Sequence, residues 1–71
     1  MDEYSELEAM INDVIDNLPD QCRQVFTMNR FKGMKYREIA EALNISLSTV
    51  KYHMSTALET LKEKLKRYHD H

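Results

Sequence analysis

The hydrophobic period of this chain is helical along its whole length and is interrupted at three points. Apolar residues recur at steps of three and four, and no stretch alternates apolar with polar residues as a strand does. The interruptions are Leu18–Pro19, Gly33 and the turn at 44–46, each of which carries a residue that begins or ends helices. We therefore predict a single all-α domain over residues 1–71, with four helices at about 3–18, 20–31, 36–43 and 47–67.

The last two predicted helices and the turn between them have the pattern of a helix-turn-helix. Asn44 tolerates the left-handed backbone that ends a helix, and the Ser46 hydroxyl is a good N-cap for the next one. Ile45, a lone apolar residue, is expected to fill the gap between the two helices. In such motifs the second helix usually enters a DNA groove.

The long last helix has an apolar stripe and an unusual opposite face. We expect the stripe to be buried, and its members are Leu47, Val50, Met54, Ala57, Leu58, Leu61, Leu65 and Tyr68. The opposite face carries Ser48, Thr49, Tyr52, Ser55, Thr56 and Glu59, with Lys51 and His53 on its flanks. A merely solvated face is usually dense in Lys and Glu, whereas hydroxyls and an exposed Tyr suit base edges and phosphates. The pattern favours DNA binding over a weakly charged surface helix.

The net charge of −2 hides an asymmetry between the two ends of the chain. Residues 1–21 hold seven acids and no Lys or Arg, while residues 22–71 hold ten bases and five acids, a net of 10 − 5 = +5. Attraction to phosphates depends on the local field and not on the total. We expect the first helix to face away from DNA, and its acidic face is more simply a solvated surface than a docking site for a basic partner.

The predicted phosphate contacts are Lys35, Arg37, Ser46 and His53. Lys35 stands where a Ser, Thr or Asp cap is expected, and a cation is unfavourable at a helix start. Contact with the DNA backbone would explain it, and a slightly frayed helix start is the alternative. Arg30 and Lys32 are further candidates for backbone contact.

The sequence offers no motif for chemistry. There is no Gly-rich phosphate loop, no zinc-ligand spacing and no nucleophile set, so we expect no enzymatic activity, no cofactor and no metal. The His69 and His71 tail holds too few ligands for a metal site. The single cysteine, Cys22, suits a reducing compartment and reads as a small buried residue. With no signal peptide and no membrane-spanning run, a cytoplasmic protein is expected.

An ordered set of residues resembles a known family, the C-terminal region 4 domain of extracytoplasmic-function (ECF) sigma factors. The set comprises Leu18–Pro19, Cys22–Arg23, Val25–Phe26, Phe31, Gly33, Tyr36, Glu38–Ile39–Ala40, Leu43, Ile45–Ser46, Thr49–Val50–Lys51, Ala57–Leu58 and Leu61. The run L-P-x-x-C-R-x-V-F is similar to members from Bacteroidetes-type bacteria. The resemblance covers about residues 16–68.

The resemblance implies a four-helix domain that recognises the promoter −35 element within RNA polymerase holoenzyme and packs on the flap of the β subunit. It further implies an anti-sigma factor as a partner and a domain that reads its site as a monomer. By position, the residues that match the promoter-reading start of the family's recognition helix are Ser48, Thr49, Lys51, Tyr52, Ser55 and Thr56. The helical wheel gives all of these except Lys51.

The sequence departs from the family pattern in three ways. Lys35 replaces a frequent Ser at the helix cap, and Thr56 stands where many members carry a basic residue, which puts base preference in doubt. The family's N-terminal domain, which melts and reads the −10 element, has no counterpart in the sequence. The resemblance therefore implies either an excised domain or a stand-alone relative.

Two other functions stay open at this point. The run Thr49–Val50–Lys51–Tyr52–His53 is similar to a T-V-K-x-H run in response-regulator DNA-binding domains of the LuxR type, which dimerise on two half-sites. The acidic first helix and the modest positive charge favour a helical protein-interaction module with an anti-sigma factor or adaptor as partner. The hydroxylic face at 48–56 argues against that module.

Overall fold

Four α-helices form the protein, in a computed structural model that describes the backbone of residues 3–69 and the side chains of residues 6–68. The helices are α1 (Glu3–Asp16), α2 (Asp20–Arg30), α3 (Tyr36–Leu43) and α4 (Leu47–His69). No strand occurs among residues 3–69, and the all-α prediction is confirmed. Of the predicted His tail, His71 and the side chain of His69 lie outside the described residues.

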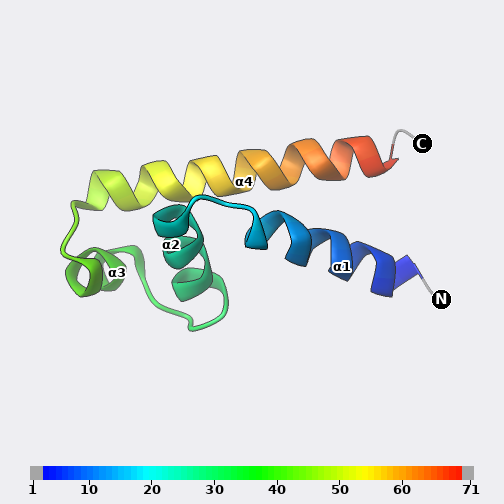
Figure 1. Cartoon of the computed structure of the whole chain (residues 1–71). Helices are drawn as coiled ribbons and strands as arrows, with labels where there is room; N and C mark the ends of the chain where they lie inside the picture. Colours follow the sequence, from blue (N-terminus) through cyan, green and yellow to red (C-terminus); the bar gives the residue numbers. More distant parts are fainter. Residues whose placement is uncertain (1–2, 70–71) are drawn as a thin grey trace.

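Helix α4 spans the whole length of the molecule and the other three helices pack against it (Figure 1). Helices α2 and α3 lie under its first half, while α1 runs antiparallel to its second half. The Cα atoms occupy an elongated volume of 41 × 19 × 17 Å. No helix within residues 3–69 combines the length and the apolar character needed to cross a bilayer.

The core lies where α2, α3 and the first half of α4 meet, and the end of α1 closes it. Val25, Ile39 and Val50 contribute one fully buried side chain from each of α2, α3 and α4, each with an exposure of 0%. Ile15 and Leu18 close the cluster from the α1 side. Burying such aliphatic side chains stabilises a fold by roughly 1.5–3 kcal/mol each, so this junction fixes the position of α4.

The corner between α1 and α2 is tied by Arg23. Its guanidinium donates to the carbonyl oxygens of Asp16 at 3.2 Å and Leu18 at 3.4 Å, and it pairs with the Asp20 carboxylate at 3.0 Å. Helix α1 ends at Asp16, two residues before the predicted limit. The Leu18 N–H donates to the carbonyl oxygen of Ile15, three residues back, and so leaves the α-helical pattern. The Leu18 side chain is still buried, as its place in the periodic pattern indicates.

The connection from α2 to α3 turns at Gly33, which has a φ of +68°. Only glycine adopts this left-handed conformation without a steric penalty. The Asn29 side chain donates to the Met34 carbonyl oxygen at 2.9 Å and holds the connection against α2. The Met34 N–H donates in turn to the Met28 carbonyl oxygen at 3.0 Å.

Helix α3 begins with a hydrogen bond that closes its first turn. The Glu38 carboxylate accepts from the Lys35 backbone N–H at 2.8 Å and so stabilises the start of the helix. A Glu three residues after the cap position performs this half of a capping box whatever side chain the cap residue carries. The Lys35 side chain therefore stays exposed and available to a partner.

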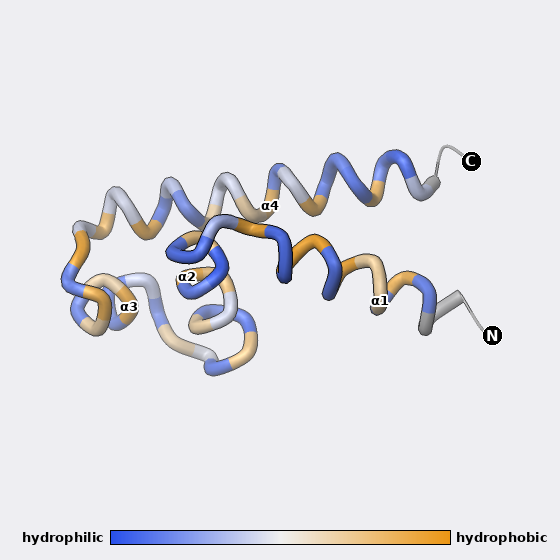
Figure 2. Tube along the Cα trace, in the orientation of Figure 1, coloured by the Kyte–Doolittle hydropathy of each residue, from blue (hydrophilic) through white to orange (hydrophobic). Residues whose placement is uncertain are grey.

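Part of the predicted α4 stripe is not buried. Leu58 is 41% exposed and Leu47 is 37% exposed, which corrects the expectation that both belong to the core. Leu47 is the first residue of α4, and Leu58 lies one position past Ala57, where the densely packed part of the core ends. Beyond this point α4 is mostly hydrophilic with apolar residues at intervals (Figure 2), and Leu61, Leu65 and Tyr68 are half-buried.

Candidate nucleic-acid interface

The turn between α3 and α4 sets the direction in which α4 leaves the core. Asn44 adopts a φ of +55° at the end of α3, as its left-handed tolerance predicts. The Ser46 hydroxyl accepts from the Thr49 N–H at 3.0 Å and caps α4. Between them, Ile45 packs against the core cluster and fills the gap between the two helices. The turn therefore contains both the residue that ends α3 and the residue that caps α4.

The first half of α4 carries the predicted base-facing residues on its outer side. Ser48, Lys51, Tyr52 and Ser55 are exposed, and Tyr52 has 67% of its surface accessible. Thr49 and Thr56 are half-buried at the borders of this surface. We name the six residues the outer face of α4, and its members are Ser48, Thr49, Lys51, Tyr52, Ser55 and Thr56.

The Thr49 hydroxyl takes part in the cap of α4. Its Oγ1 lies 2.8 Å from the Ser46 Oγ, and the two hydroxyls share one hydrogen bond at the helix start. Both hydroxyls therefore have fixed positions before any partner approaches. Fixed polar groups lose little conformational freedom when they bind, which favours recognition.

Two hydrogen bonds join α2 to His53 of α4, and a ring contact within α4 continues from His53 to Tyr52. His53 Nε2 lies 3.1 Å from the Gln21 side-chain oxygen, and the His53 ring meets the Tyr52 ring edge to face, with centroids 5.6 Å apart. The Cys22 thiol donates to the His53 carbonyl oxygen, with Sγ 3.3 Å from the oxygen. The N-terminal turn of α2 thus contacts both the backbone and the side chain at one position of α4.

The cationic residues proposed for the DNA backbone come from the start of α3 and the end of α2. Lys35 and Arg37 are exposed at the first turn of α3. Arg30 is exposed at the last residue of α2, with its guanidinium 6.0 Å from the centre of the Phe26 ring, and Lys32 is exposed in the loop that follows. These side chains add positive charge next to the helix-turn-helix.

The Cys22 thiol is buried between α2 and α4. Burial raises the pKa of the Cys22 thiol, so the sulfur stays protonated at neutral pH and is a weak nucleophile. No group of three or more His, Cys, Asp and Glu among the described side chains could hold a metal ion. The geometry supports recognition of a partner through preformed contacts.

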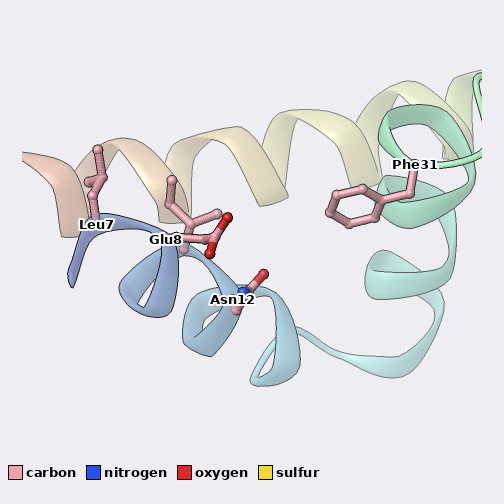
Figure 3. Close-up of a pocket in the computed structure, with 5 residues that line it drawn as sticks. Leu7, Glu8, Asn12 and Phe31 are labelled. Carbon is pink, nitrogen blue, oxygen red and sulfur yellow. The ribbon is translucent and has the colours of Figure 1, made fainter. Parts of the chain in front are cut away.

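A separate apolar groove lies between α1 and the end of α2 (Figure 3). It is lined by Leu7, Glu8, Ile11 and Asn12 of α1 and by Phe31. Phe31 is 67% exposed and contributes a large apolar surface to the groove. The residues of this groove do not overlap with the outer face of α4.

Two features of the site escaped the sequence reasoning. Gln21 lies 32 residues before His53, and no local spacing links them. The role of Glu38 could have been found, because Glu at the third helical position is half of the capping-box signature. Lys35, in place of the Ser or Thr that usually completes this signature, makes it hard to recognise.

Comparison with known proteins gives a consistent family. The family model described as "Sigma-70, region 4" matches residues 8–61, which include α2, α3 and the whole outer face of α4. The chain is 33% identical over 61 residues to the ECF RNA polymerase sigma-E factor of Haemophilus influenzae, a match that covers 86% of this chain and 32% of that protein.

Two further relatives carry the same kind of name. The RNA polymerase sigma-H factor of Pseudomonas aeruginosa is 30% identical over 84% of this chain and 31% of its own length. The ferric citrate uptake sigma factor FecI of Escherichia coli is 33% identical over 78% of this chain and 33% of its own length. The chain thus spans about a third of the length of the curated relatives it matches. Together with the helix-turn-helix geometry, these matches show that the chain belongs to the Sigma-70 region 4 family, a family of DNA-binding regulators.

Proposed function

We propose that this chain binds duplex DNA of the promoter −35 element through the outer face of α4 and so supports transcription initiation by RNA polymerase. The observation that carries the proposal is the exposed hydroxylic and aromatic surface on a helix whose start is capped and whose back is buried. The major groove of DNA is wide enough to admit an α-helix. The hydroxyls and the tyrosine of this surface can then hydrogen-bond base edges or contact thymine methyls. The sigma-factor names of the relatives support this role over a LuxR-type domain.

The proposed contacts divide into base reading and backbone positioning. Base reading falls to the six residues of the outer face of α4, among which Tyr52 has 67% of its surface accessible and Lys51 is exposed on the flank. Lys35, Arg37 and the Ser46 hydroxyl at the start of α4 contact phosphates, because they are exposed at the two helix starts of the motif. The fourth predicted phosphate contact is His53, whose Nε2 is hydrogen-bonded to the Gln21 side chain.

The partners on the protein side are the flap of the RNA polymerase β subunit and an anti-sigma factor. The groove lined by α1 and Phe31 supports such a role, because it is apolar, open and apart from the DNA-binding residues. Protein interaction is therefore the second candidate function, and it is compatible with DNA binding. We propose that the chain occupies a single promoter site as a monomer.

The experiment that tests DNA binding starts from a random pool of duplexes. Selection of bound duplexes at two salt concentrations should enrich one short motif, and the affinity for it should fall as salt rises because counterions are released on binding. Lys51→Ala should weaken binding and reduce the slope of log K against log salt by about 0.9 if Lys51 also neutralises a phosphate.

The matched control is Lys64→Ala, which removes an exposed lysine from the second half of the same helix. It should leave the selected motif and its discrimination unchanged. Sedimentation with the selected duplex should show one chain for each site. Selection that enriches nothing, or equal effects of the two lysine variants, would refute the proposed face.

A further inference from the structure

We infer that Gln21 of α2 is a positioning residue for DNA reading, and that it acts through His53 to hold the Tyr52 ring. This inference rests on the proposed function and deepens it. Its geometric basis is the series of contacts from the Gln21 oxygen to His53 Nε2 at 3.1 Å, and from the His53 ring to the Tyr52 ring at 5.6 Å with an interplanar angle of 61°.

The hydrogen bond fixes the His53 ring. The Gln21 side-chain oxygen is an acceptor, so His53 Nε2–H is the donor of this hydrogen bond. The same position is anchored a second time, since the His53 carbonyl oxygen accepts from the buried Cys22 thiol. With its Nε2–H bonded to α2, the His53 ring also meets the Tyr52 ring in an edge-to-face contact.

The ring contact then restricts Tyr52. An exposed tyrosine on a helix usually samples several rotamers. Ordering such a side chain at the moment of binding costs conformational entropy and therefore weakens the affinity. An edge-to-face contact between two rings favours one orientation, because the positive edge of one ring meets the negative face of the other. Tyr52 is therefore preorganised on the outer face of α4, although 67% of its surface is accessible.

The position of Gln21 explains why α2 matters for recognition. Gln21 is exposed at the N-terminal turn of α2, outside the core cluster, so its side chain contributes little to the packing of the helices. Its side-chain contact is with α4, at the residue next to Tyr52. A residue that is not on the recognition helix thus controls the geometry of the side chain that projects from it.

The test replaces Gln21 and measures discrimination between duplexes. Gln21→Leu keeps a side chain of similar shape without the acceptor, and Gln24→Leu is the matched control on the same exposed side of α2. For Gln21→Leu we expect the preference for the selected duplex over its single-base variants to fall about three- to tenfold at the base pairs read by Tyr52, the range that one hydrogen bond supplies. Gln21→Glu, which restores an acceptor, should recover that pattern of preference, and Gln24→Leu should match the wild type.

A double-variant comparison separates positioning from a general structural effect. In a Tyr52→Ala background, Gln21→Leu should no longer change discrimination, because the side chain it orients is absent. An equal loss of discrimination with and without the Tyr52 ring would overturn the inference. So would a Gln21→Leu protein that discriminates like the wild type.

A measurement without DNA keeps the inference distinct from the proposed function. Side-chain NMR of the free chain should show one χ1 rotamer for Tyr52 and a ring-to-ring contact with His53 in the wild type and in Gln24→Leu. In Gln21→Leu, Tyr52 should average over rotamers while the melting temperature is unchanged. If the wild-type chain selects no duplex but this NMR pattern holds, the proposed function fails and the positioning by Gln21 stands. A wild-type Tyr52 ring that already averages would refute the positioning itself.

Discussion

The thiol of Cys22 donates to the backbone carbonyl oxygen of His53, with Sγ and O 3.3 Å apart, and so joins α2 to the first half of α4. Only 1% of the Cys22 surface is accessible, and burial raises the pKa of its thiol. A neutral thiol fits this place because it fills volume and donates weakly, whereas a thiolate would have to lose its hydration.

The first prediction concerns alkaline pH. Because the pKa of Cys22 is higher in the folded chain than in the unfolded chain, the folded form holds the proton more tightly. The stabilising contribution of Cys22 is therefore fully present below the thiol pKa of the unfolded chain, about 8.5, and is lost as pH rises through the folded value. Urea unfolding from pH 7 to 10 should show a steeper decline for the wild type than for Cys22→Ala. Parallel pH profiles would contradict the assignment.

The second prediction compares two apolar residues of different burial. Ile39→Ala removes a fully buried side chain from α3 and should lower the free energy of unfolding by about 2–5 kcal/mol. Leu58→Ala removes a side chain that is 41% exposed, and the loss should be below about 1.5 kcal/mol, since a large part of its surface stays in water after folding. Thermal and urea unfolding of both variants measure the difference, and equal losses would show that Leu58 is buried after all.

The third prediction separates two serines at the start of α4. Ser46→Ala removes the acceptor for the Thr49 N–H and should lower the free energy of unfolding by about 0.5–2 kcal/mol. Ser48→Ala, two residues later on the exposed side, should change it by less than about 0.5 kcal/mol. Urea titrations followed by circular dichroism would give both values. Identical curves for Ser46→Ala and wild type would argue against the cap.

The fourth prediction concerns the left-handed residue between α3 and α4. Asn44 has a φ of +55°, and an alanine in this conformation is strained by roughly 1–2 kcal/mol. Asn44→Ala should therefore lower the melting temperature, whereas Asn44→Gly should leave it within a few degrees of the wild type. Differential scanning calorimetry checks the pair, and the reverse order of melting temperatures would contradict the turn geometry.

Local signals were sufficient for the helices and for the turn of the helix-turn-helix. Pro19, Gly33 and Asn44 act through their own backbone preferences, which is why a sequence period with three breaks predicts three connections. The Ser46 cap is equally local, since its acceptor and donor lie three residues apart. The family assignment is confirmed, while the Bacteroidetes-type affiliation and the roles of the individual site residues stay predictions.

What the sequence could not supply are relationships between helices. The periodic pattern of α4 predicts burial for every leucine of the stripe. The actual burial of Leu58 depends on how α2 and α3 pack beneath it. The Gln21–His53 hydrogen bond likewise depends on the angle at which α2 meets α4. Exposure of Phe31 depends on the direction of the α2–α3 connection and not on its own period. Contacts of this kind join residues far apart in the chain, so no local sequence spacing predicts them.

Helix α4 is continuous from Leu47 to His69 and is therefore a rigid element. The outer face of α4 and the distal part of the helix, beside α1, behave as one rigid body, because an intact helical hydrogen-bond ladder does not bend easily between them. A protein bound to the distal part would therefore contact the same rigid helix that carries Tyr52 and Lys51 without touching either residue. A partner at one extremity and the proposed DNA contacts at the other would share one continuous element.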